Sequence, residues 1–65
     1  MNISLKLSKI VAGYTLASLA DAAGVGYDRL RNICYEGRLP TQDEAKRIAN
    51  ILHRPVAALF PEVKS

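Results

Sequence analysis

Two short helical patterns meet at Ala23-Gly24-Val25-Gly26, and this junction limits the folds open to the chain more than any other feature of the sequence. Gly24 can adopt a positive φ angle without the steric penalty that a Cβ atom brings, so the chain can turn sharply there. Ala20, in the middle of the preceding pattern, is small enough for the next helix to pack closely across it. We therefore expect two helices that cross at about 90–120° over a tight turn.

Capping residues set the ends of this pair. Thr15 is a good N-cap for the first helix, which Gly24 then ends. The second begins near Gly26 or Tyr27 and runs to about Tyr35. Arginine and asparagine side chains alternate there with Leu30 and Ile33, so one face is apolar and the other polar.

Three further helices are expected around the pair. The first covers about Ser4 to Ala12. Ile3, Leu7, Ile10 and Tyr14 make its expected apolar face, with Leu5 and Val11 beside it and the centre of the face left open. The capping box Thr41-Gln42-Asp43-Glu44 starts another. A short last helix follows Pro55, from Val56 to Phe60. The sequence thus predicts an all-α fold of five helices with short connections, forming one domain over residues 1–65.

Composition excludes several functions. The single cysteine, Cys34, allows no internal disulfide, and with one histidine, His53, the chain lacks the three or four ligands of a zinc site. No glycine-rich phosphate loop or catalytic triad is present, so we expect neither an enzyme nor a cofactor. No apolar run approaches the ~20 residues that span a bilayer, which favours a cytoplasmic protein. The formal net charge of +3 suits a polyanionic partner.

The stretch from Thr15 to Gly26, T-L-A-S-L-A-D-A-A-G-V-G, resembles the T-Q-x-x-L-A-x-x-x-G-V-S signature of helix-turn-helix regulators of the Cro and lambda-repressor type. Pro40-Thr41 is similar to the family's N-P-S before its fourth helix, and Leu59-Phe60 to its closing D-E-L-F. The resemblance implies a lambda-repressor-like fold with the helix-turn-helix at helices two and three. It also implies a transcription regulator, by default a repressor, that binds double-stranded operator DNA in the nucleoid.

In this family the third helix enters the major groove, with its N-terminal part at the base edges. The resemblance therefore assigns base contacts to four residues of that helix, Tyr27, Asp28, Arg31 and Asn32. Arg31 could pair with guanine and Asn32 with adenine. Phosphate contacts are expected from a second set, Thr15, Arg29, Arg38, Lys6 and Lys9. Several have an ordinary alternative: Asp28 can stabilise the helix dipole, Tyr27 can cover the edge of the core, and the lysines can be plain surface charges.

The resemblance also implies a homodimer without a small-molecule ligand or membrane partner. Its interface is expected at Val56, Leu59 and Phe60, because this segment carries more apolar surface than one short helix can bury. The alternative function is a protein-interaction module on the same fold, such as an antitoxin or an adaptor. A non-specific DNA binder would need a larger excess of basic residues than nine against six acidic ones.

Overall fold

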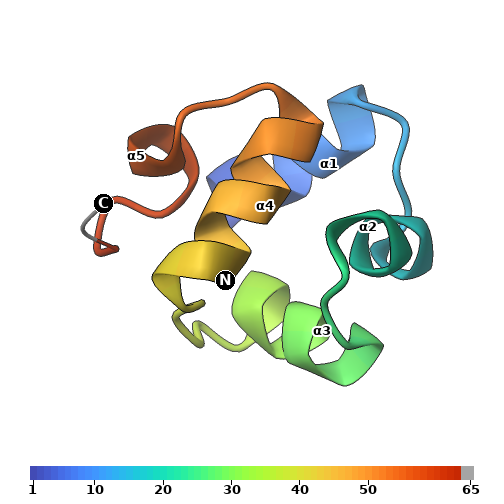
Figure 1. Ribbon diagram of the computed structural model, residues 1–65, viewed down its shortest axis with the longest axis horizontal. Coiled ribbons are helices and arrows are strands. Elements are labelled where there is room, and N and C mark those ends of the chain that lie inside the picture. The colour runs from blue at the N-terminus through green and yellow to red at the C-terminus, as the bar shows by residue number, and fades with distance from the viewer. Residues whose placement is uncertain (64–65) are drawn as a thin grey trace.

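The computed structural model describes residues 1–63, and over this range the backbone forms five helices and no strand. The helices are α1 (Ile3–Val11), α2 (Leu16–Ala23), α3 (Tyr27–Tyr35), α4 (Gln42–Leu52) and α5 (Val56–Leu59). Figure 1 shows α4 in the centre of the molecule, with α2 and α5 on either side, α3 below it and α1 behind it. The expected all-α fold of five helices is confirmed. Residues 64 and 65 of the expected domain lie outside the described residues.

Local capping determines most of the helix ends, as the sequence predicted. The Thr15 hydroxyl accepts from the Ser18 amide at 3.0 Å, and the Thr41 hydroxyl accepts from the Glu44 amide at 3.2 Å. Gly24 ends α2 in the left-handed conformation, with φ 68°. His53 has the same role after α4, with φ 55°, although it carries a Cβ atom.

The core collects apolar side chains from all five helices. Leu19 of α2, Leu30 of α3 and Ile48 of α4 have no exposed surface. Leu59 and Phe60, at the end of α5, are each only 1% exposed and close the opposite side of the core. The inner faces of α2 and α3 thus pack on this core, which fixes the orientation of both helices and leaves their outer faces exposed.

The expected inward face of α1 is wrong. The buried residues of this helix are Leu5 and Lys9, whereas Ile3, Leu7 and Ile10 are all more than half exposed. Leu5 lies about 160° around the helix from Leu7, a separation of two residues. The face of α1 that packs against α3 and α5 is therefore the face with Leu5. It lies opposite to the face with the most apolar residues.

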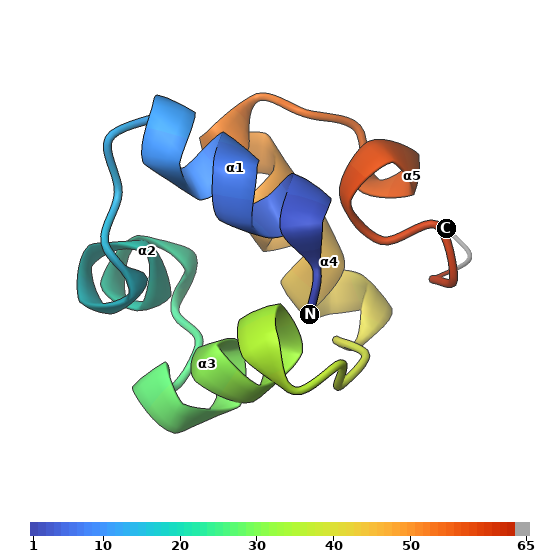
Figure 2. The same ribbon diagram turned by 180° about the vertical axis from the view of Figure 1, so that it is seen from behind.

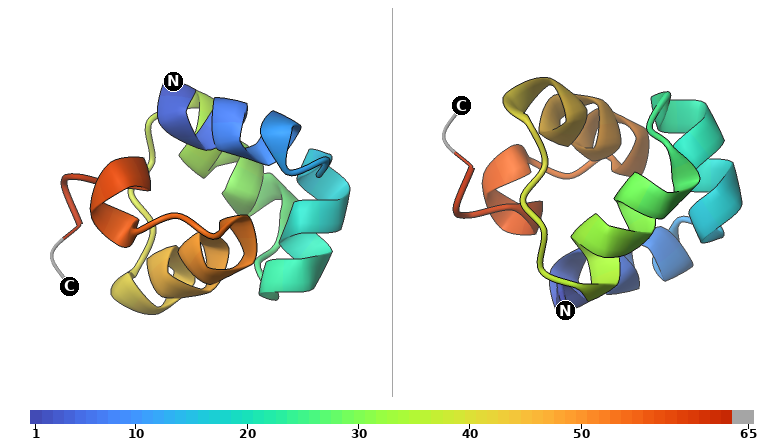
Figure 3. Two further views of the ribbon diagram at one scale, coloured as in Figure 1. Left: turned by 90° about the horizontal axis from the view of Figure 1, so that it is seen from above. Right: turned by 90° about the horizontal axis from the view of Figure 1, so that it is seen from below.

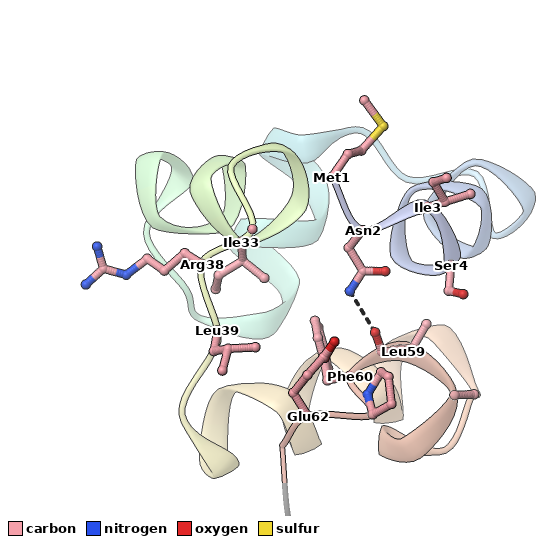
Figure 4. Close-up of a pocket in the computed structure, with 13 residues that line it drawn as sticks. Met1, Asn2, Ile3, Ser4, Ile33, Arg38, Leu39, Leu59, Phe60 and Glu62 are labelled. Atoms are coloured by element: carbon pink, nitrogen blue, oxygen red, sulfur yellow. Dashed lines mark hydrogen bonds between the residues drawn. The ribbon is translucent and has the colours of Figure 1, made fainter.

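Asn2 connects the start of α1 to two other elements. Its side chain accepts from the Leu5 amide at 2.9 Å and so caps α1, while its Nδ2 atom donates to the Leu59 carbonyl at 2.7 Å (Figure 4). Its backbone amide donates to the Cys34 carbonyl at 2.8 Å. One residue thus joins the beginning of α1 to the last turns of α3 and α5.

Candidate nucleic-acid interface

The turn between α2 and α3 fixes the orientation of α3. The Val25 amide donates to the Ala20 carbonyl at 2.9 Å, which closes the end of α2 around Gly24. Val25 is 7% exposed and Ala20 only 4%, so the turn itself is packed into the core. Figure 3 shows in its right-hand view, from below, that α3 lies across this side of the molecule with α2 beside it. One long face of α3 is consequently open to a ligand.

That open face carries the residues to which the sequence assigned base contacts. Tyr27, Asp28 and Arg31 are exposed, and Asn32 is half-buried. Because residues three and four apart are neighbours on a helix surface, these four side chains share one side of α3, while Leu30 and Ile33 point into the core. The structure therefore brings the four candidates together on a single surface. It offers a phenol, a carboxylate, a guanidinium and an amide, which together can donate to and accept from base edges.

Arg29 points to a different partner. Its guanidinium forms a two-point ion pair with Glu44 of α4, in which Nε donates to Oε2 and Nη2 donates to Oε1, the latter at 2.8 Å. The same Oε1 atom accepts from the Thr41 amide at 2.8 Å. The hydrogen bonds from Arg29 lower the pKa of the buried Glu44 carboxyl to about 2. Arg29 thus connects α3 to the capping box of α4, which the sequence did not reveal because the partners are 15 residues apart.

Arg47 also has a role that the sequence did not indicate. Its Nη1 atom donates to the carbonyls of Ala23 and Gly24, at 3.2 and 3.5 Å, and its Nη2 atom lies 3.0 Å from the Asp43 carboxylate. A cation at the C-terminal end of a helix stabilises the unpaired carbonyls there. Arg47 therefore ties α4 to the turn that positions α3.

The remaining candidates for phosphate contacts occupy different environments. Arg38 is exposed in the loop after α3, and its side chain extends away from the body of the molecule (Figure 4). Lys6 is half-buried, with Nζ 5.8 Å from the centre of the Tyr35 ring. Thr15 is exposed, but its hydroxyl serves as the cap of α2. Lys9 is only 8% exposed, so most of its side chain takes part in the packing of α1, and its expected phosphate contact stays a prediction.

The expected dimer interface at the end of the chain is also largely wrong. Leu59 and Phe60 are buried within a single chain, and Val56 is half-buried against the core. The segment therefore finds its apolar partners inside its own molecule. Leu59 and Phe60 are therefore not free to contact a second copy.

The sequence profile of a helix-turn-helix family matches residues 12–59 of the chain. The chain belongs to this family. The matched range contains the whole of α2, α3, α4 and α5, and thus the turn at Gly24 and the open face of α3. The resemblance to regulators of the Cro and lambda-repressor type is confirmed, and with it a lambda-repressor-like fold that serves DNA binding. No curated protein sequence and no solved structure matches the chain.

No group of three or more histidine, cysteine, aspartate or glutamate side chains in residues 1–63 could hold a metal ion. None of the helices described is long and apolar enough to cross a membrane. A hollow of about 300 Å³ lies between the start of α1, the loop after α3 and the end of α5 (Figure 4). The exposed face of α3 is thus the surface of the described residues that best fits a binding function.

Proposed function

We propose that this helix-turn-helix protein reads operator DNA in the major groove through α3 and represses transcription by occupying the promoter. The observation that supports the proposal is the shared outward face of Tyr27, Asp28, Arg31 and Asn32 on the second helix of the motif. A major groove about 12 Å wide admits one α-helix, and its base edges are read by such donors and acceptors. The protein acts in the cytoplasm, on nucleoid DNA.

Arg31 and Arg38 divide between them the two kinds of DNA contact. Arg31 is exposed near the middle of α3 and reaches a base edge, where it can form two hydrogen bonds with guanine. Arg38 is exposed in the following loop, where a phosphate is the natural partner. The exposed first turn of α2, after Thr15, offers further backbone amides to a phosphate. Arg29 has no DNA contact in this proposal, because Glu44 holds its guanidinium.

Two copies bind one operator. The largest dimension of the chain is 25 Å, whereas equivalent positions in successive major grooves of one DNA face lie about 34 Å apart. One chain therefore reads one groove, and a palindromic site needs a second. The DNA-reading surfaces of the two chains are then related by a two-fold axis, as are the two halves of a palindromic operator.

Binding titrations with operator DNA and scrambled DNA at several salt concentrations test the proposal. Arg31→Ala is expected to cost about 1–3 kcal/mol on the operator and to relax the preference at one base pair. Arg38→Ala is expected to weaken both DNAs alike and to reduce the salt slope by about one unit. Equal weakening of both DNAs by Arg31→Ala would contradict base reading by α3. No effect of either variant would favour the interaction-module alternative.

A further inference from the structure

The outer face of α1 is apolar, although nothing in the described chain covers it. Ile3, Leu7, Ile10 and Val11 are 63, 56, 55 and 78% exposed, and they follow one another at helical spacing along a single stripe. The opposite face of the same helix buries Lys9. A helix that exposes four large apolar side chains and buries a lysine has the reverse of the usual pattern for a surface helix. Figure 2 shows α1 across the front of the molecule, with α4 behind it.

We infer that this stripe, the α1 stripe, is the surface through which two copies of the chain pair, with their α1 helices antiparallel. It extends the proposed binding of two copies to one operator, but it is a property of the free protein. The α1 stripe takes the place of the interface expected at Leu59 and Phe60, because these two side chains are buried in the core of the single chain.

The order of the stripe residues supports a second copy as the occupant. Leu7 lies midway between Ile3 and Val11, so a two-fold axis at Leu7 places it against its own equivalent and places Ile3 against Ile10 and Val11 of the partner. A contact of this kind is self-complementary, as a two-fold interface must be. The stripe itself contains no charged residue. It therefore offers nothing to an acidic or basic partner, and it imposes no repulsion between identical chains at the centre of the contact.

The area of the stripe indicates how tight the pair is. Complete burial of a side chain of this size removes about 60–120 Å² of apolar surface from water. The four side chains thus contribute roughly 150–300 Å² per chain, which at most reaches the lower limit of the largest apolar patch on a typical monomer, about 300–600 Å². A pair built mainly on such a patch belongs to the weak interfaces, which bury less than about 1,200 Å² in total. We therefore expect the free protein to pair only at high protein concentration.

Cysteine substitutions test the arrangement directly. Under mild oxidation by a glutathione buffer, Leu7→Cys is expected to form a disulfide-linked dimer, because an antiparallel pair brings the two equivalent positions together. Ile3→Cys, at a position of similar exposure, is the matched control and is expected to remain monomeric alone. A mixture of Ile3→Cys and Val11→Cys is expected to give the mixed dimer. The native Cys34 is fully buried, and burial raises its thiol pKa, so the unaltered chain serves as the blank.

Sedimentation equilibrium provides the second measurement. The average mass of the unaltered chain is expected to rise from 7.1 kDa towards twice that value as the concentration increases to 1 mM. Leu7→Lys is expected to stay at the monomer mass with unchanged helical circular dichroism, because Leu7 is not part of the core. A constant monomer mass for the unaltered chain would overturn the inference. Self-pairing of Ile3→Cys as fast as that of Leu7→Cys would overturn the antiparallel arrangement. Neither result would bear on DNA binding by α3, which the titrations measure separately.

Discussion

Single residues in the left-handed region show how this small chain forms its helix ends. Gly24 after α2 and His53 after α4 both have a positive φ angle, and both donate their amide to the preceding turn. Gly24 adopts this conformation without steric cost, whereas the Cβ atom of His53 makes it unfavourable. Equivalent positions at two helix ends are therefore occupied by one favourable and one strained residue, and substitutions at the two should have opposite effects.

Replacing His53 with glycine should stabilise the protein. The substitution removes the strain of a non-glycine residue at φ 55°, and part of this gain is offset by the greater freedom of glycine in the unfolded chain. We expect the free energy of unfolding to increase by about 0.5–1 kcal/mol, measured by urea denaturation with an unchanged slope. His53 is exposed, so removal of its imidazole costs little packing. A lower denaturation midpoint would show that the imidazole makes a stabilising contact.

Gly24→Ala should have the opposite effect. The added Cβ atom would strain the backbone at φ 68° and would lie 3.2 Å from Nη1 of Arg47, which caps the same turn. We expect a loss of about 1–3 kcal/mol in the free energy of unfolding. Gly26→Ala is the matched control, because Gly26 has an ordinary φ of −60° and an added Cβ would meet nothing closer than 4.0 Å. Equal losses for the two variants would mean that the left-handed conformation is not what Gly24 supplies.

At the scale of the helices, the sequence predicted what depends on neighbouring residues and missed what depends on distant ones. The ends of α2 and α4 were predicted because a cap and its helix lie within three or four residues of each other. The inward face of α1 was not, because α1 carries apolar residues on two opposite faces and the choice between these faces is made by α3 and α5. The outward face of α3 was predicted, since only one side of that helix is polar. The partner of Arg29 was not, because it lies on another helix.

The ion pair between Arg29 and Glu44 makes the attachment of α4 to α3 dependent on pH. The folded-state pKa of Glu44, about 2, lies below its ordinary value of 4.5, so the stabilisation is complete above pH 4.5 and is lost as the pH falls towards 2. Because the side chain of Arg29 is about a third exposed, we expect solvent screening to limit the contribution to about 1–2 kcal/mol.

Denaturation midpoints between pH 2 and pH 6 test this dependence. Glu44→Gln should lower stability at pH 6 and should make the decline towards pH 2 shallower than in the unaltered chain. Asp43→Asn is the control, since Asp43 is exposed and pairs with Arg47 at the surface. If Glu44→Gln followed the unaltered chain in parallel over the whole range, the acid sensitivity would have to come from other carboxylates.

For the molecule as a whole, both ends of the described fold are fastened to its centre. The start of α1 reaches α3 and α5 through Asn2, and α5 places Leu59 and Phe60 in the core that also supports α3. The reading face of α3 and the α1 stripe are among the surfaces that remain open. A domain of 65 residues buries only about 60% of the surface of its unfolded chain, so each such attachment is a substantial part of its stability.

Asn2 should be the most sensitive of these attachments. Asn2→Ala removes the cap of α1 and the hydrogen bond to the Leu59 carbonyl, and we expect a loss of about 1.5–3 kcal/mol in the free energy of unfolding. Asn2→Asp keeps an oxygen for the Leu5 amide and adds a negative charge at the start of α1, but it cannot donate to Leu59. It should therefore recover the part of the loss that belongs to the cap. Hydrogen exchange distinguishes the two contributions: in Asn2→Asp, the amide of Phe60 at the end of α5 should exchange faster while the amides of α2 remain protected. Uniform acceleration across all helices would instead mean that α5 opens only together with the whole domain.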